Sequence, residues 1–287
     1  MTCNTSMMQQ ATHVWDADGH LLHAMTYAED NRLATYNGHA VIHDADGNMI
    51  HGPLQGDMAE FLYDSRNRLI RAGDHVYRYD AEDRRIAQIV EGTEIRYVID
   101  PEAYYSQLLM EADDQGNPIA YYIYGHGLIA RVDAEGAYQT YHYDRRGSTV
   151  ALTDLAGHVT DRYTYGIYGE LLNAEGETKQ PFLYNSRDGV MTDDNGLYYM
   201  RARYYHPEIK RFINRDVVPG TIAEAQTLNR YAYVNGNPIS YVDPFGLARA
   251  GDLTFLEKSA YFLRDFVRFR ECSRTGCKYK HYIDGYR

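Results

Sequence analysis

The chain has 287 residues, of which 44% are hydrophobic, and its formal net charge at pH 7 is −11. This composition suffices for a buried core, and the sequence has no run of 18 or more apolar residues, which excludes a membrane-spanning helix. Residues 248–287 hold nine Lys/Arg and five Asp/Glu, so the negative charge belongs to residues 1–247. This acidic body argues against a nucleic-acid partner, because like charges repel the phosphate backbone.

The N-terminal residues 1–20 show neither the basic segment nor the apolar segment of a Sec signal peptide. The three cysteines lie near the two ends of the chain, at Cys3, Cys272 and Cys277. An odd number at these positions does not make a disulfide framework and fits a reducing compartment. We therefore expect synthesis in the cytoplasm.

One sequence unit recurs along the first half of the chain. It runs from an aromatic residue and Tyr-Asp, or an equivalent pair, through two or three turn-forming residues into a short apolar segment. Its copies are residues 15–27 (WDADGHLLHAMTY), 43–52 (HDADGNMIHG), 61–90 (FLYDSRNRLIRAGDHVYRYDAEDRRIAQIV) and 141–154 (YHYDRRGSTVALTD).

The unit has the chemistry of a β-hairpin. Alternation of Tyr with other residues has period 2, which places one set of rings on one face of a sheet. Asp at a strand end accepts hydrogen bonds from the following backbone amides, and Asp-Gly or Asn-Gly supplies the positive φ of a tight turn. We therefore interpret these aspartates as turn-formers. The sequence predicts an all-β fold, a strip of hairpins, followed by a short α-helical C-terminal tail.

The repeat resembles the YD repeats of bacterial Rhs proteins, of the C subunits of Tc insecticidal toxins and of animal teneurins. Three further stretches are similar to the Rhs-associated core domain. They are residues 141–170 (YHYDRRGSTVALTDLAGHVTDRYTYGIYGE), 182–216 (FLYNSRDGVMTDDNGLYYMRARYYHPEIKRFINRD) and 228–247 (LNRYAYVNGNPISYVDPFGL). The resemblance implies a YD-repeat β region at 1–140, a core domain at 141–247 and a variable tail at 248–287, a toxin stub or remnant.

What the resemblance implies for function is enclosure. In the family a spiral of repeats forms a hollow shell around a C-terminal toxin, and self-cleavage frees the toxin. The expected partners are the chain's own tail or a toxin domain, the rest of a shell, an immunity protein or a component of a secretion system. Members are often exported by dedicated machines, so secretion by a non-Sec route is expected after cytoplasmic synthesis.

The resemblance also implies a self-cleavage site. By position, the family's pair of catalytic aspartates falls on Asp216 and Asp243, and the scissile bond joins Leu247 to Ala248. Two neighbouring carboxyls cannot both ionise readily, so one keeps its proton while the other activates water. The alternative interpretation of both residues is turn formation, which suits Asp243 before Pro244. Acid-labile cleavage of the Asp-Pro bond would instead cut after Asp243.

Arg215 and Arg211 are the candidates to tune this pair by charge. The chain departs from the family's commoner D-P-x-G at the first aspartate, because Asp216 is followed by Val-Val-Pro-Gly. The activity implied is at most a single-turnover autoproteolysis by the aspartate pair, and it needs no cofactor.

The tail predicts one helix over residues 253–270, where apolar residues recur with helical spacing. Beyond it, Cys272, Cys277 and His281 are spaced C-x4-C-x3-H. A structural zinc site needs four ligands, so this set is one short and no metal is assigned. A tail of this size is small for a catalytic domain.

Two other functions compete with enclosure. The 29 tyrosines suit a binding module that stacks rings on carbohydrate or a cell-surface partner. A hydrolase acting on external substrates has less support, since the sequence shows no nucleophile motif. The open edges of a hairpin strip also predict self-association.

Overall fold

The computed structural model describes residues 10–15, 21–103 and 105–247, and the regular secondary structure of these residues is almost entirely antiparallel β-strand. The all-β prediction is therefore confirmed, whereas the predicted helix at 253–270 lies outside the described residues. Among the described residues no helix is long and apolar enough to cross a membrane.

The elements in chain order are β1 (Gln10–Trp15), β2 (Leu21–Tyr27), β3 (Leu33–Tyr36), β4 (His39–Ala40), β5 (Ile42–His43), β6 (Met49–Leu54), β7 (Asp57–Tyr63), β8 (Leu69–Ala72), β9 (His75–Tyr79), β10 (Arg85–Val90), β11 (Thr93–Asp100), β12 (Gln107–Ala112), β13 (Pro118–Gly125), β14 (Gly127–Asp133), β15 (Tyr138–Tyr143), β16 (Thr149–Thr153), β17 (Val159–Tyr165), β18 (Leu171–Glu175), η1 (Ser186–Asp188), β19 (Met191–Thr192), β20 (Tyr198–Met200), β21 (Arg203–His206), β22 (Arg211–Phe212), η2 (Ala225–Leu228) and η3 (Val234–Gly236).

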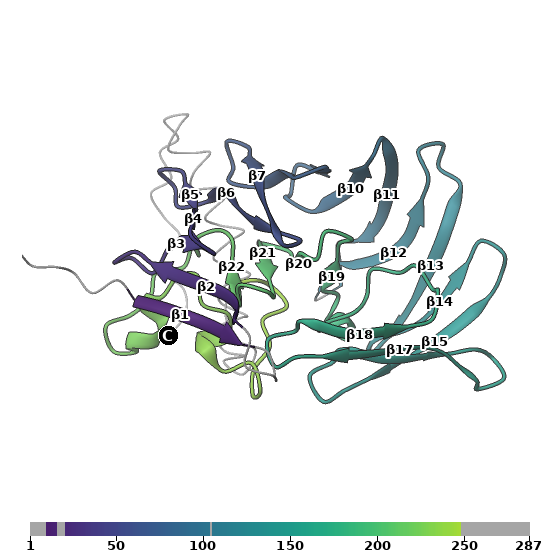
Figure 1. The fold of residues 1–287 in the computed structure, drawn as a ribbon. Helices are drawn as coiled ribbons and strands as arrows, with labels where there is room; N and C mark the ends of the chain where they lie inside the picture. The colour runs from purple at the N-terminus through teal and green to yellow at the C-terminus, as the bar shows by residue number, and fades with distance from the viewer. Residues whose placement is uncertain (1–9, 16–20, 104, 248–287) are drawn as a thin grey trace, which may run out of the picture.

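The strands form three sheets. A 14-stranded sheet, which we call the strip, contains β5 to β18 in chain order, and each strand pairs antiparallel with its neighbour in the sequence. Two 4-stranded sheets contain β1–β4 and β19–β22. Figure 1 shows the strip curving around β19–β22, so the later sheet lies inside the arc of the earlier one. We call residues 181–247, which include β19–β22, the central segment.

Each repeat turn is built by its aspartate. At Asp64 the carboxylate Oδ1 accepts the amides of Arg66 (2.9 Å) and Arg68 (3.0 Å), while the Asp64 carbonyl accepts the amide of Asn67. In the other repeat turns the amide three residues after the aspartate donates to the aspartate's carbonyl, and the amide four residues after it donates to Oδ1. These turns begin at Asp44, Asp80, Asp113, Asp133, Asp144 and Asp154. These aspartates are turn-formers, as the sequence predicts.

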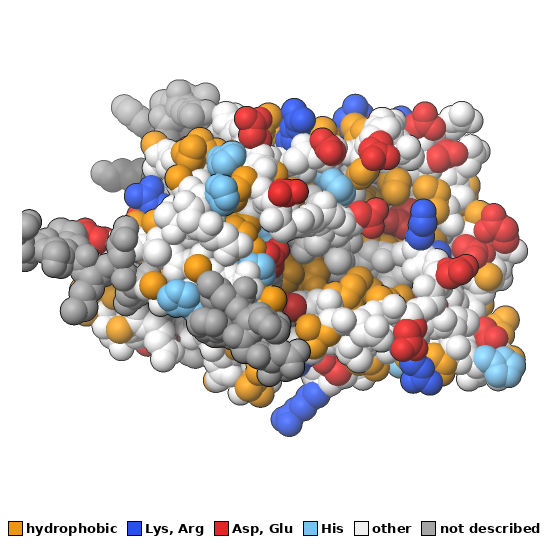
Figure 2. Space-filling view, viewed as in Figure 1, with side chains coloured by type: hydrophobic (Ala, Val, Ile, Leu, Met, Phe, Trp, Pro, Cys, Tyr) orange, Lys and Arg blue, Asp and Glu red, His pale blue; other side chains and the backbone are white. Residues whose placement is uncertain are grey.

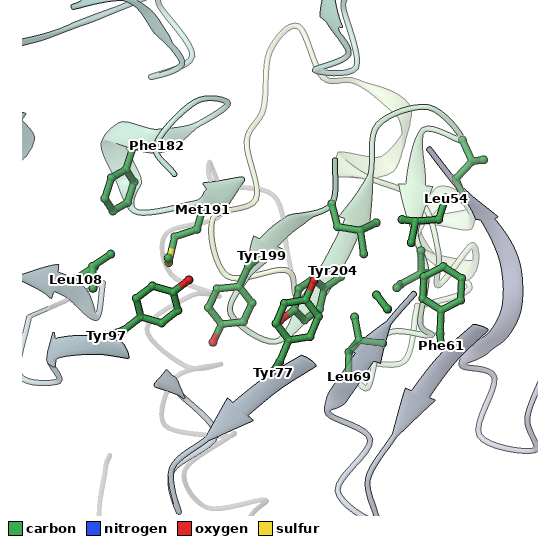
Figure 3. Packing of buried hydrophobic residues seen from close by; sticks show 14 of the residues in the cluster. Leu54, Phe61, Leu69, Tyr77, Tyr97, Leu108, Phe182, Met191, Tyr199 and Tyr204 are labelled. Atoms are coloured by element: carbon green, nitrogen blue, oxygen red, sulfur yellow. The ribbon is translucent and has the colours of Figure 1, made fainter. Parts of the chain in front are cut away.

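The side chains of the strip alternate between its two faces, as the period of 2 in the sequence predicts. In β13, Ala120 and Tyr122 are buried, whereas the alternating Ile119, Tyr121 and Ile123 are exposed. The inward face packs against the central segment. Figure 3 shows Tyr77 and Tyr97 of the strip facing Tyr199, Tyr204 and Met191 of the central segment. Tyrosine therefore serves here chiefly as core.

A buried ion pair joins the strip to the central segment. Arg85 of β10 is 1% exposed, and its Nη1 lies 2.7 Å from Oδ2 of Asp193, which is 4% exposed. Four tyrosine rings surround the guanidinium with centroids at 4.4–5.9 Å, namely Tyr77, Tyr97, Tyr199 and Tyr204. Cation–π attraction and the ion pair together compensate the cost of burying this charge.

Asp193 can make this pair because a neighbour takes over its turn role. Its carbonyl still accepts the Gly196 amide, as in the repeats. The amide of Leu197, however, donates to Oδ1 of Asn195 at 3.1 Å. The Asp193 carboxylate is thereby released from the turn and reaches Arg85.

Replacing Asp193 with alanine should destabilise the protein by about 3–5 kcal/mol, because it leaves Arg85 buried without its counter-ion. The free energy of unfolding from urea denaturation measures the loss. Glu94→Ala is the matched control, since Glu94 pairs with Arg78 and Arg96 at the surface and its loss should leave the midpoint unchanged.

Combining Arg85→Met with Asp193→Leu should recover part of the stability lost in Asp193→Ala, because no unpaired charge remains buried. An Asp193→Ala protein as stable as the Glu94→Ala control would contradict the role of this pair.

Candidate functional site

The motif DPFG, residues 243–246, forms a turn that docks on the β20–β21 hairpin. The Gly246 amide donates to the Asp243 carbonyl at 3.2 Å, and the Leu247 amide donates to the Asp243 carboxylate at 3.0 Å. This is the turn of the repeats, used once more at the end of the described chain. We call residues 241–247 the seam.

Glycine is required at position 246 for two reasons. Its φ is +68°, and a Cβ there would lie 2.6 Å from the Met200 carbonyl oxygen and 3.1 Å from the Arg203 amide. The Ala202 amide also donates to the Phe245 carbonyl at 3.2 Å. The seam is therefore held in backbone contact with the hairpin.

Two arginines of the hairpin donate hydrogen bonds to carbonyls of the seam. Arg201 donates to the Pro244 carbonyl at 2.6 Å, and its guanidinium lies 5.6 Å from the centroid of the Phe245 ring. Arg203 donates from Nε to the Gly246 carbonyl. Arg201 lies in the β20–β21 turn with a φ of +54°, and Arg203 is the first residue of β21.

Arg203 also brings the two predicted aspartates together. Its Nη2 lies 2.7 Å from Oδ2 of Asp216 and 3.7 Å from Oδ2 of Asp243. Asp243 is 2% exposed, and the guanidinium is 4% exposed. The two carboxylates thus share one buried cation.

Asp216 is fixed by the segment that follows β22. Its amide donates to the Arg230 carbonyl at 2.9 Å, and its Oδ1 accepts the Val218 amide at 2.8 Å. Arg203 donates to the same Arg230 carbonyl at 3.0 Å. Burial raises the pKa of the Asp216 carboxyl above its usual range, even though Arg203 and Arg230 favour the charged form. The raised pKa favours a protonated Asp216 carboxyl.

The two arginines suggested by the sequence, Arg211 and Arg215, contact other residues in this structure. Arg211 lies over the Tyr27 ring at 4.2 Å and donates to the Asn31 carbonyl, far from the aspartate pair. Arg215 is exposed, and its stem lies against Gly47. The arginine that contacts both aspartates is Arg203, which the sequence reasoning missed. The signal was present in MRARYY, where two arginines with strand spacing precede paired tyrosines.

The predicted cleavage position is described only on its N-terminal side. Leu247 is 7% exposed, so the last described residue of the seam is buried. Ala248 lies outside the described residues, as do Cys272, Cys277 and His281.

The sequence matches a family model described as teneurin YD-shell over residues 4–239. It is 28% identical over 227 residues to the tRNA nuclease WapA of Bacillus subtilis, which covers 75% of this chain and 9% of that protein. It is also 28% identical over 279 residues to double-stranded DNA deaminase toxin A of Burkholderia cenocepacia, which covers 82% of this chain and 19% of that protein. The chain therefore spans a small part of these relatives.

The fold is similar to one chain in the structure of the Tc holotoxin pore of Photorhabdus luminescens. The TM-score is 0.59 at 17% sequence identity, and the match covers 84% of this chain and 13% of that chain. At this identity the likeness concerns the fold.

Replacing Arg203 with glutamine should destabilise the protein by about 3–5 kcal/mol at neutral pH, because two buried carboxylates lose their common cation. Without the cation the pKa of Asp216 rises further above its value in the unfolded chain, so the folded state binds its proton more readily. The loss should therefore shrink as the pH falls from about 7.5 to about 5.

Urea denaturation at the two pH values measures this difference, with Arg215→Gln as the charge-matched control. The control should unfold like the parent protein at both pH values, since Arg215 is exposed and away from the pair. A loss in Arg203→Gln that stays constant or grows on acidification would contradict the assignment.

Proposed function

The chain belongs to the teneurin YD-shell family, and we propose that it is a segment of an Rhs-type toxin shell that encloses a C-terminal effector and releases it by cutting its own chain after Leu247. The observation that carries the proposal is the convergence of Asp216, Asp243 and the buried seam on the single guanidinium of Arg203.

The relatives support the enclosure part of the proposal. One is named as a tRNA nuclease and another as a DNA deaminase. Each is nevertheless 28% identical to this chain over most of the length of this chain. A region common to both does not by itself specify either activity. An enclosing scaffold that serves different effectors accounts for such a shared region.

The geometry supports a hydrolytic role for the aspartate pair. In the proposed reaction, Asp243 as carboxylate removes a proton from a water that attacks the Leu247 carbonyl carbon. Asp216, whose pKa is raised by burial, protonates the departing amide nitrogen of Ala248 as the C–N bond breaks. Arg203 contacts both carboxyls and donates to the carbonyl of Gly246, the residue before Leu247.

The alternative, a binding module that presents tyrosine rings to carbohydrate, draws little support from the structure. Many of the tyrosines, such as Tyr77, Tyr122 and Tyr141, are buried in the core and unavailable for stacking on a ligand.

Asp216→Asn and Asp243→Asn should each abolish cleavage after Leu247, because each removes an ionisable carboxyl while keeping an oxygen that can accept the turn hydrogen bonds. Intact mass spectrometry of the purified full chain measures the products. Cleavage of the parent protein should accelerate as the pH falls from about 7.5 to about 5, since the fraction of protonated Asp216 grows.

Asp113→Asn is the matched control, because Asp113 makes the same turn at an exposed site and should be cleaved like the parent. A cut after Asp243 in the parent, Asp216→Asn and Asp113→Asn proteins, lost in Asp243→Asn, would identify acid lability of the Asp-Pro bond and contradict catalysis by the pair. Cleavage after Leu247 that persists in both variants, or a parent chain that stays uncut, would overturn the self-cleavage proposal.

A further inference from the structure

A pocket of about 270 Å³ is lined in part by the first two residues of the seam. Its lining consists of Arg145, Arg146, Arg187, Ile239, Ser240, Tyr241 and Val242. Three arginines gather there although the chain carries a net charge of −11. Acidic side chains gather elsewhere, on the side of the molecule that β11–β15 form (Figure 2). The pocket is thus a local concentration of positive charge in an acidic protein.

Two of the arginines are held in place by the fold. Arg146 lies in the turn between β15 and β16, where it donates to the Ile167 carbonyl at 2.9 Å and contacts Asp144 at 3.3 Å. Arg187 belongs to η1, and its amide donates to the Gly147 carbonyl at 3.0 Å. These positions come from the strip and from the central segment, so the pocket lies where the two meet.

Gly147 lets the arginines approach each other. Its φ is +81°, and a Cβ there would lie 3.3 Å from both Cζ and Nε of Arg187. The guanidinium of Arg187 therefore rests directly on the backbone of the turn that carries Arg145 and Arg146. A Cβ at position 147 would require Arg187 to shift by a few tenths of an ångström.

The positive charge of the pocket is incompletely compensated. Arg187 meets Asp188 only at 3.4 and 3.5 Å, which is long for a charge-assisted hydrogen bond. Arg145 is exposed and, within the described part of the chain, has neither a hydrogen bond nor an ion pair. Three guanidinium groups thus face two carboxylates, those of Asp144 and Asp188.

We propose that this pocket binds a phosphoryl group. Guanidinium groups present planar pairs of N–H donors that match phosphate oxygens, and arginine is the side chain best suited to such recognition. The Ser240 hydroxyl adds a neutral donor to the lining. The volume accommodates inorganic phosphate or a small phosphate ester, so the shared chemistry is a phosphate dianion held by Arg145, Arg146 and Arg187.

Binding at this place would reach the seam directly. Tyr241 and Val242 form one wall of the pocket and lead into Asp243, while Arg145 and Arg146 form another wall from the strip. A bound dianion would join the two walls and reduce local opening of residues 239–242. This linkage is independent of the proposed self-cleavage, because it needs neither aspartate to act as a catalyst.

Isothermal titration of the full chain with inorganic phosphate, and separately with glycerol 3-phosphate, tests the proposal at constant ionic strength. We expect saturable one-site binding and slower hydrogen exchange at residues 239–242. Equal affinities would assign recognition to the phosphoryl group alone, and tighter binding of the ester would assign part of it to the remaining pocket volume. If neither inorganic phosphate nor glycerol 3-phosphate binds, the proposal is overturned.

Arg145→Gln should weaken binding roughly tenfold or more, which corresponds to the loss of a hydrogen bond to a charged group. This variant is suitable because Arg145 is exposed and its replacement removes no native bond. Arg162→Gln, an equal charge change at an exposed site outside the pocket, should retain the parent affinity. If phosphate binding weakens equally in both variants, the loss reflects the change in net charge, which would contradict a specific site.

Discussion

A single curved sheet has one apolar face to cover, and the chain covers it with its own later residues. The buried Arg85–Asp193 pair is a polar interaction that fixes the position of the central segment on the strip. A hydrophobic contact tolerates sliding, whereas a buried guanidinium surrounded by tyrosine rings and one carboxylate has one satisfactory position. The placement of β19–β22 inside the strip therefore depends on this pair as well as on apolar burial.

The geometry of the seam follows from that placement. Once β20 and β21 are fixed against the strip, Arg201 and Arg203 are in place, and the carbonyls of the DPFG turn dock against them. The same hairpin supplies Tyr204 and Tyr205 to the core on opposite faces of β21 and two arginines to the seam. Core packing and the candidate site therefore depend on the same short strands.

Local patterns in the sequence predicted the local structure well. An Asp followed three residues later by Gly, Asn or Asp marks each turn, because the aspartate, the following amides and the positive φ all lie within five residues. The partners of Arg85 and Arg203 could not be predicted in this way. Asp193 meets Arg85 only where the central segment docks on the strip, and Asp216 and Asp243 meet Arg203 only in the folded central segment. The motif resemblance located Asp216 and Asp243, but proximity in sequence suggested Arg211 and Arg215, which the fold directs to Tyr27 and Gly47.

The order of strands in the strip has a consequence for how the molecule is made. Every strand from β5 to β18 pairs with its neighbours in the chain, so each new hairpin can add to a sheet that already exists. The central segment follows the strip in the chain, and it needs the complete strip to bury its tyrosines. Synthesis from the N-terminus therefore completes the strip before β19–β22, and the seam docks only after the strip and these strands have formed. A ribosome that releases the chain in this order keeps the Asp-Pro turn and its arginines apart until assembly is nearly complete.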